Sequence, residues 1–197
     1  MRPLFITTKY RRTEKSTSLK TAKENNMDKR IDNSDNEWLG LFETKDGYIY
    51  SKELKGSGNI VSVLGYRESN DKIEFVGRFE DNPVFHEDKL SLTALTGMIE
   101  ENESPSKAAV REFYEEAGIK IDEKDLIDLG TLKPSSSACL CYIYAIDIKD
   151  AEPKNSDGDG TDREKKARCE MVTTKDISAS SSAVLCATLL KLINYLS

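Results

Sequence analysis

Apolar and polar residues follow a strand-like pattern between Trp38 and Glu80, in the runs WLGLFE, DGYIYSKE, NIVSVLGYRE and KIEFVGRFE. Asp-Gly, Gly-Ser-Gly and Ser-Asn-Asp stretches separate these runs, and such stretches favour turns. Short alternating or fully apolar runs bounded by turn residues are typical of β-strands. We therefore predict strands in this part of the chain, followed by another apolar stretch from Leu90 to Gly97.

The second half of the chain mixes helical and extended patterns. A helical segment opens at Ser104-Pro105 and closes at Gly118, and LIDLGTL, CLCYIYAIDI and RCEMVTT are predicted to be strands. From Ser180 to Leu196, leucine and isoleucine recur at spacings of three and four, which predicts a C-terminal helix. Helices and strands are therefore expected to be intermixed along the chain, with strands dominant.

Residues 1–36 differ from the rest, because they are polar and show no period of two or 3.6. Such composition predicts a disordered tail, or one ordered only on contact. A transit peptide is the alternative, but Glu14 and Glu24 follow the basic start too soon. We therefore divide the chain into a tail (1–36), N-terminal strands (37–58) and a main domain (59–197).

Composition and charge exclude several classes of protein. The 197 residues are 38% hydrophobic with a net charge of −6, which suffices for one buried core but argues against a general nucleic-acid coat. No apolar run approaches the roughly 20 residues of a membrane-spanning helix. The cysteines lack the density of a disulfide scaffold and the spacing of a zinc site, so we expect a reducing, cytoplasmic compartment.

The segment from Gly97 to Ile119, GMIEENESPSKAAVREFYEEAGI, has the local signals of a capped helix. Ser104 is a good N-cap, Pro105 suits the first helical position, and Gly118 can take the left-handed conformation that ends a helix. An apolar stripe repeats every fourth residue and is predicted to be buried, at Ala109, Phe113 and Ala117.

Glu112, Glu115 and Glu116 are neighbours on another side of this helix. Like charges at that spacing destabilise a helix, and the negative end of the helix dipole repels them further. Arg111 can pair with Glu115, but one guanidinium cannot neutralise three carboxylates. Mg²⁺ prefers carboxylate oxygens and bridges them to substrate phosphates, so the cluster is a candidate platform for a metal-bound diphosphate. The alternative is a solvated acidic helix face.

The spacing in this segment resembles the complete Nudix box, carried by Gly97, Glu103, Arg111, Glu112, Glu115, Glu116 and Gly118. One position departs slightly, because Phe113 fills a slot that is usually aliphatic. The resemblance implies an α/β/α sandwich built on a mixed sheet, with a short N-terminal β region beside it. It also implies a hydrolase of nucleoside diphosphate derivatives that uses Mg²⁺ or Mn²⁺, in which a metal-assisted water attacks phosphorus.

Carried over residue by residue, the resemblance assigns metal ligands and bracing residues. Glu112 and Glu116 are the implied principal metal ligands, and Glu115 shares a metal or holds water. Glu103 and Arg111 are implied to pair and brace the loop against the helix. The resemblance also implies that the backbone approaches the metal beside Gly97, with the carbonyl of Thr96 as a further ligand and Met98 next to the substrate.

Features outside the box resemble the ADP-ribose and ADP-sugar pyrophosphatases. Pro134 lies 16 residues after Gly118, like the proline of that subfamily. EWLGLFETKDGYIYSKE resembles its N-terminal strands, which build a homodimer and supply aromatics that stack on adenine, here Trp38 with Tyr50 or Tyr48. The implied reaction converts ADP-ribose to AMP and a sugar phosphate. Core or interface packing is the alternative role for Trp38.

Other nucleotide substrates stay open, because parts of the chain depart from that subfamily. Relatives carry an arginine facing the phosphates where this chain has Glu80, and we expect Arg78 to replace it only if the strand register differs. NADH, a capped RNA end and a dinucleoside polyphosphate are alternative substrates, and a non-catalytic nucleotide sensor is an alternative function. We expect no stable nucleic-acid partner.

The general base is not evident in the loop after Pro134, which is Ser-Ser-Ser-Ala where relatives are often acidic. We predict that it comes from DGDGTDREKK, with Glu164 as the first candidate and Asp162 as the second. The alternative is that these acids only solvate a flexible loop. We predict no catalytic role for His86.

Overall fold

The computed structural model describes residues 28–69, 72–82, 84, 89–154 and 166–197. In chain order, its elements are β1 (Lys29–Arg30), β2 (Leu39–Glu43), β3 (Ile49–Glu53), β4 (Ile60–Ser69), β5 (Lys72–Glu80), β6 (Ser91–Thr93), β7 (Leu95–Met98), α1 (Pro105–Ala117), a 3₁₀ turn η1 (Glu123–Asp125), β8 (Ile127–Leu132), β9 (Cys141–Asp147), β10 (Arg168–Thr173), α2 (Thr174–Ala179) and α3 (Ala183–Leu196). No helix within these ranges is long and apolar enough to cross a membrane.

The main sheet is mixed and is built around β4. Its strand order is β10-β5-β4-β9-β8, with β6 paired to β5 and β7 paired to β4. The β4–β9 pairing is parallel and the others are antiparallel. One end of β4 pairs with β7 and the other end pairs with β5. Because β7 precedes α1 and pairs with the central strand, the chain enters α1 from the middle of the sheet.

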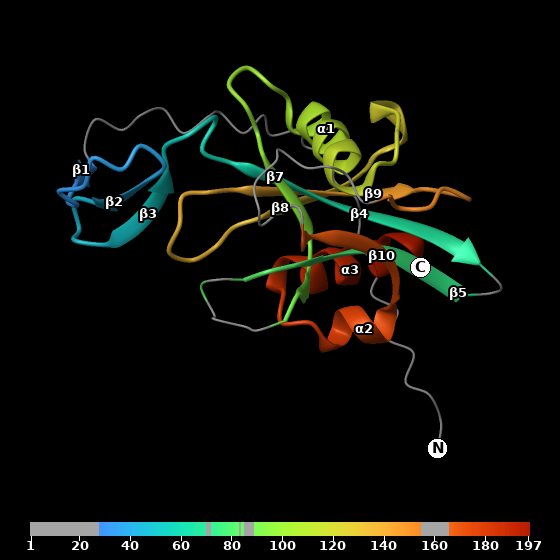
Figure 1. The fold of residues 1–197 in the computed structure, drawn as a ribbon. Helices are drawn as coiled ribbons and strands as arrows, with labels where there is room; N and C mark the ends of the chain where they lie inside the picture. The colour runs from blue at the N-terminus through green and yellow to red at the C-terminus, as the bar shows by residue number, and fades with distance from the viewer. Residues whose placement is uncertain (1–27, 70–71, 83, 85–88, 155–165) are drawn as a thin grey trace.

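Helices cover both faces of the main sheet, as Figure 1 shows: α1 lies on one face, and α2 and α3 lie on the other. The α1 side contains one cluster of buried residues, which includes Val61, Val76, Leu95, Phe113 and Ile146. The opposite side contains another, which includes Leu64, Phe75, Ile143, Ile177 and Leu185. Each large side chain so buried contributes about 2 kcal/mol through its loss of contact with water. The α/β/α sandwich that the sequence predicted is therefore confirmed.

Phe113 fits its slot because β4 has a glycine opposite it. Phe113 is fully buried, and a Cβ placed on Gly65 would lie 2.7 Å from its ring. The missing side chain at Gly65 leaves room for an aromatic ring where an aliphatic residue is usual. The main sheet beneath α1 therefore provides the space for Phe113, the one residue that departs from the usual box.

We predicted one C-terminal helix starting at Ser180, but the structure has two helices after β10, and the start of the predicted helix was wrong. A separate helix, α2, begins directly after β10 with a capping box between Thr173 and Asp176. The second helix, α3, begins at Ala183 and is capped by Ser182. Hydrophobic periodicity missed α2 because six residues give too few turns for a period to emerge.

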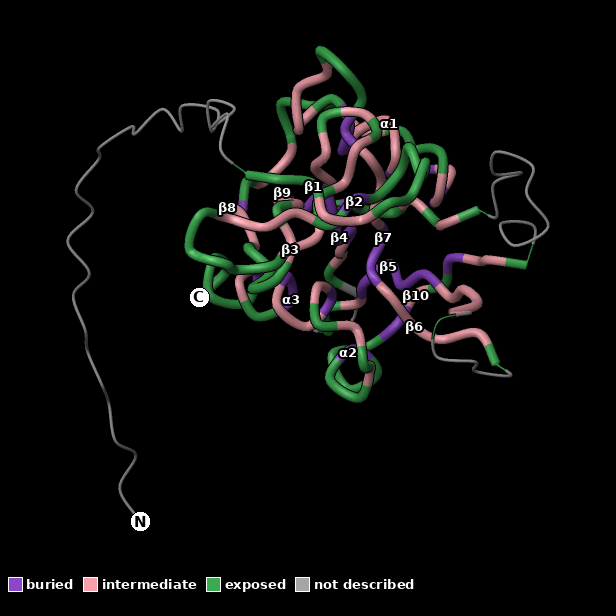
Figure 2. The backbone as a smooth tube through the Cα atoms, turned by 90° about the vertical axis from the view of Figure 1, so that its left-hand side faces the viewer, coloured by how far each residue is buried: buried purple, intermediate pink, exposed green. Residues whose placement is uncertain are grey.

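A three-stranded sheet, β1-β2-β3, lies beside the main sheet. Its backbone is mainly exposed or of intermediate burial (Figure 2). It starts earlier than the predicted boundary at residue 37, because Lys29 and Arg30 already pair with β2. The hydroxyl of Tyr48 donates to the carbonyl of Ser135 (2.5 Å), so this sheet is tied to the loop after Pro134.

Candidate functional site

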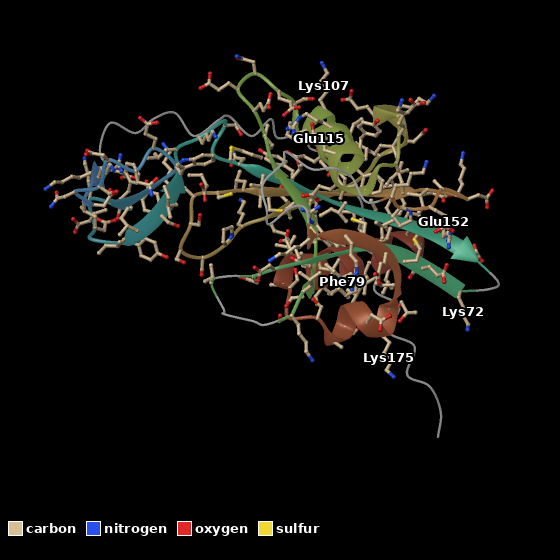
Figure 3. The ribbon with its side chains drawn as sticks, in the orientation of Figure 1. Lys72, Phe79, Lys107, Glu115, Glu152 and Lys175 are labelled. Atoms are coloured by element: carbon tan, nitrogen blue, oxygen red, sulfur yellow. The ribbon has the colours of Figure 1, made fainter. Side chains whose placement is uncertain are left out.

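Helix α1 begins and ends as its sequence predicted. The Ser104 hydroxyl accepts a hydrogen bond from the Lys107 backbone N–H (3.3 Å), and Gly118 has a φ of 67°. The last turn of α1 contains no basic residue, so the positive charges that offset its glutamates at the negative end of the helix dipole come from outside that turn. Figure 3 shows Glu115 on α1, on the other side of the main sheet from Lys175 of α2.

Arg111 joins the helix to the loop before it. Its guanidinium makes two bonds to Glu103, Nε to Oε1 at 3.0 Å and Nη2 to Oε2 at 2.9 Å, and Nη2 also donates to the Met98 carbonyl (2.8 Å). Nη1 contacts Glu112 (2.7 Å) and Glu115 (3.2 Å). The bond from Arg111 lowers the pKa of Glu103, so this carboxylate is held ionised.

Glu112 packs directly on the backbone of β7. A Cβ on Gly97 would lie 1.7 Å from the Glu112 carboxyl carbon, so no side chain fits at position 97. Burial raises the pKa of Glu112, although Arg111 opposes this shift. The structure thus places a carboxylate with 15% side-chain exposure against Gly97, which the resemblance assigned to the same site.

Arg78 reaches the box from β5. Its Nη1 lies 3.3 Å from Oε1 of Glu116, and its Nε lies 3.0 Å from Oε2 of Glu80. Burial opposes the charge of Arg78, but Glu116 and Glu80 outweigh it and raise its pKa. Residues two apart on a strand share a face, and Arg78 and Glu80 contact each other in the register that β5 adopts. That Arg78 replaces the phosphate-facing arginine stays a prediction.

The charges and donors of this cluster fit a divalent cation. Among the described residues, five carboxylates (Glu80, Glu103, Glu112, Glu115 and Glu116) surround two guanidinium groups (Arg78 and Arg111), an excess of three negative charges within this set. Carboxylate oxygens are the donors that Mg²⁺ and similar hard cations prefer. In the described part of the chain no three acidic, histidine or cysteine side chains converge as a formed metal site, and the glutamates of the cluster instead contact Arg78 and Arg111.

The remaining predicted binding residues lie on the N-terminal sheet and in loops. Trp38 is 54% exposed, so it is no core residue of this chain, and the Lys55 ammonium lies 3.3 Å from its ring centroid. Tyr50 stacks on Phe42, with ring centroids 5.8 Å apart. Pro134 lies in the loop between β8 and β9. Glu164, Asp162 and His86 lie outside the described residues.

Cys169 is a neighbour of the site that sequence reasoning missed. It pairs with Arg78 across β10 and β5, and its thiol donates to the carbonyl of Glu116 (3.4 Å). Burial raises the pKa of this thiol to about 12, so it is a neutral packing group. Only the strand pairing brings it to α1, and no local pattern in the sequence signals that pairing.

The NUDIX domain family matches residues 58–184, which include β4, the box on α1 and β10. The chain belongs to the Nudix family. Nudix membership supports pyrophosphohydrolase activity, and Nudix hydrolases generally use divalent metal ions. The carboxylate excess around Arg111 and Arg78 is consistent with that dependence.

Two solved structures resemble this chain. The crystal structure of an ADP compounds hydrolase has 18% identity and a TM-score of 0.56, and covers 86% of this chain and 91% of its own. The NUDIX domain of Shewanella oneidensis NrtR, complexed with ADP ribose, has 13% identity and a TM-score of 0.55, and covers 70% of this chain and 87% of its own. At such identities the likeness shows the shared fold.

Proposed function

We propose that this Nudix protein hydrolyses the pyrophosphate bond of ADP-ribose or a related ADP-sugar, releasing AMP and a sugar phosphate. The observation that carries the proposal is the intact glutamate set on α1, with Glu112 seated over Gly97 and Glu103 bound twice by Arg111. A solvated acidic face would not need a glycine beneath one carboxylate or a bidentate brace beside it.

In this proposal Glu112 and Glu116 hold a divalent cation, Mg²⁺ or Mn²⁺, with Glu115 and the Thr96 carbonyl as further ligands. When bound, the cation activates water and offsets charge on the phosphate oxygens. Glu115 is exposed enough to exchange Arg111 for a new partner, since 54% of its side chain is accessible. Arg111 also holds the loop through the Met98 carbonyl, which fixes the backbone at the candidate ligand Thr96.

Hydrolysis then needs a base and a charge partner for the phosphates. A water oxygen bonds to one phosphorus, the bridging oxygen leaves with the other phosphate, and the water proton passes to the base. We assign the base to Glu164. Arg78 is the guanidinium that we assign to the substrate phosphates, because it lies beside Glu116 and is fixed by Glu80.

The ADP-ribose assignment rests on weaker features of the same chain. Pro134 lies in a loop that the N-terminal sheet holds, and Trp38 and Tyr50 are aromatic residues on that sheet. We propose that Trp38, with Tyr50, stacks on adenine in a homodimer, and that the enzyme works in the cytoplasm. The resemblance to an ADP compounds hydrolase and to an ADP-ribose-bound domain supports the nucleotide class.

The direct test incubates the full chain with ADP-ribose and Mg²⁺ and measures AMP by chromatography. We expect AMP from the wild type and a loss of at least about a hundredfold in Glu116→Gln, which removes one metal-binding charge. Glu123→Gln is the matched control, because Glu123 bonds to Ser106 at the opposite end of α1. An equal rate in Glu116→Gln and Glu123→Gln contradicts the proposal.

Glu80 favours a second candidate, a Nudix hydrolase of another nucleoside diphosphate derivative. It carries a negative charge at the place where the subfamily has a phosphate-facing arginine, and it binds Arg78 at 3.0 Å. A panel of NADH, capped RNA and a dinucleoside polyphosphate separates the two. If a panel member is hydrolysed faster than ADP-ribose, that compound replaces ADP-ribose as the assigned substrate. Tight binding without turnover of any member identifies a nucleotide sensor.

A further inference from the structure

Glu80, Arg78 and Glu116 form a chain of charges that runs from the edge of the site to the glutamate cluster. Arg78 contacts Glu80 at 3.0 Å and Glu116 at 3.3 Å, and only 9% of its side chain is exposed. Glu80 is more accessible than Glu116, with 31% against 16% of the side chain exposed. A nearly buried guanidinium is therefore shared between one carboxylate of the box and one outside it.

This arrangement creates a competition at Glu116. A guanidinium beside a carboxylate repels a divalent cation that approaches the same oxygens, and burial strengthens the repulsion because little water screens it. Without a second partner, Arg78 would also lose its counter-charge when a cation took Glu116. An ionised group left uncompensated in a buried setting destabilises the state that contains it.

We propose that Glu80 is a positioning residue that sets the metal affinity of the glutamate cluster through Arg78. Glu80 retains the guanidinium when a cation takes Glu116, so Arg78 keeps a counter-charge and its orientation. The inference uses the metal site of the proposed function but not the identity of the nucleotide. Under this proposal Glu80 has a role of its own, and is more than the absence of the arginine that relatives carry at this position.

The test titrates the nucleotide-free full chain with Mn²⁺ and follows free Mn²⁺ by electron paramagnetic resonance. Glu80→Gln keeps the shape of the side chain but removes its charge, and we expect it to raise the Mn²⁺ dissociation constant about fivefold. Glu80→Asp restores the charge and should recover part of the affinity. Glu74→Gln is the matched control, because Glu74 lies on the same strand and pairs with Arg67; we expect less than about a twofold change.

A double-mutant cycle shows whether Glu80 acts through Arg78. In an Arg78→Met background, Glu80→Gln should change Mn²⁺ affinity no more than Glu74→Gln does. Equal effects of Glu80→Gln with and without Arg78 overturn the inference, as does an unchanged dissociation constant in Glu80→Gln alone. Thermal unfolding of each variant without metal identifies loss of the fold.

Kinetics separate this inference from the proposed function. In a chain that hydrolyses ADP-ribose, Glu80→Gln should raise the metal concentration for half-maximal rate about fivefold, whereas Glu74→Gln should change it less than about twofold. A chain that binds Mn²⁺ with the expected Glu80 dependence but leaves ADP-ribose intact overturns the substrate assignment and supports the inference. If the chain hydrolyses ADP-ribose but its Mn²⁺ affinity does not depend on Glu80, the substrate assignment is supported and the inference is overturned.

Discussion

The carboxyl group of Glu112 occupies the space that a side chain at Gly97 would need, since a Cβ there would lie 1.7 Å from its carboxyl carbon. Gly97 is in β7 and Glu112 is in α1, so the contact fixes the distance between strand and helix at the candidate metal site. Position 97 requires a glycine because the Glu112 carboxyl group lies so close to its backbone, and not because of its backbone conformation. This relationship leads to the first prediction.

Gly97→Ala should displace Glu112 and weaken metal binding. We expect a fall of about 1–3 kcal/mol in the free energy of unfolding, because the added methyl group overpacks the helix against the strand. Urea unfolding and Mn²⁺ titration measure the two effects. Gly47→Ala is the control, since it strains a turn with φ of 81° away from the site and should leave Mn²⁺ affinity unchanged. Unaltered Mn²⁺ binding in Gly97→Ala would contradict the arrangement.

The Glu103–Arg111 pair should make stability depend on pH in a defined window. Arg111 lowers the pKa of Glu103 below its ordinary value of 4.5 in the folded chain. The ionised pair therefore contributes stability above that ordinary pKa, and the contribution is lost as pH falls through the lower folded value. Unfolding of Glu103→Gln and wild type at several pH values measures this.

We expect the destabilisation by Glu103→Gln to be largest between pH 6 and 7, on the order of 1–3 kcal/mol, and to shrink below about pH 4. Glu123→Gln serves as the comparison. The Glu123 carboxylate accepts a hydrogen bond from the Ser106 hydroxyl, and no cationic side chain contacts it in the described structure. A deficit that is the same at pH 3.5 and pH 7 would show that Glu103 acts by shape and not by charge.

Phe113 and Gly65 should be energetically coupled. A Cβ on Gly65 would lie 2.7 Å from the Phe113 ring and 2.8 Å from Val76, so we expect Gly65→Ala to cost about 1–3 kcal/mol. Phe113→Leu frees space, and the double variant should be less destabilised than the two single changes added together. Urea unfolding of the four proteins tests this. Strict additivity would mean that the two residues do not share the space.

The helix and the composition of the site were predictable because their signals are local. Ser104, Pro105 and Gly118 specify the ends of α1, and the spacing of its glutamates and Arg111 identifies the family. Arg111 was correctly paired with Glu103, which lies eight residues earlier and before the start of α1. The ends of the helix follow from local chemistry, and the Glu103–Arg111 pair follows from the resemblance to the Nudix box.

Contacts between distant segments were not predictable from one sequence. The Arg78–Glu116 pair depends on how β5 lies beneath α1, and the space for Phe113 depends on a glycine in β4. Period two on β5 does place Arg78 and Glu80 on one face, but it does not show which helix that face meets. The partners of Arg78 therefore emerged only with the assembled sheet.

The central claim is that the glutamates of α1 bind divalent cations, and crystals grown with Mn²⁺ test it most directly. An anomalous difference map should show a peak about 2.0–2.2 Å from oxygens of Glu112 and Glu116, with Glu115 turned away from Arg111. A map with no peak in this cluster, at Mn²⁺ concentrations that saturate the protein in solution, would contradict the account.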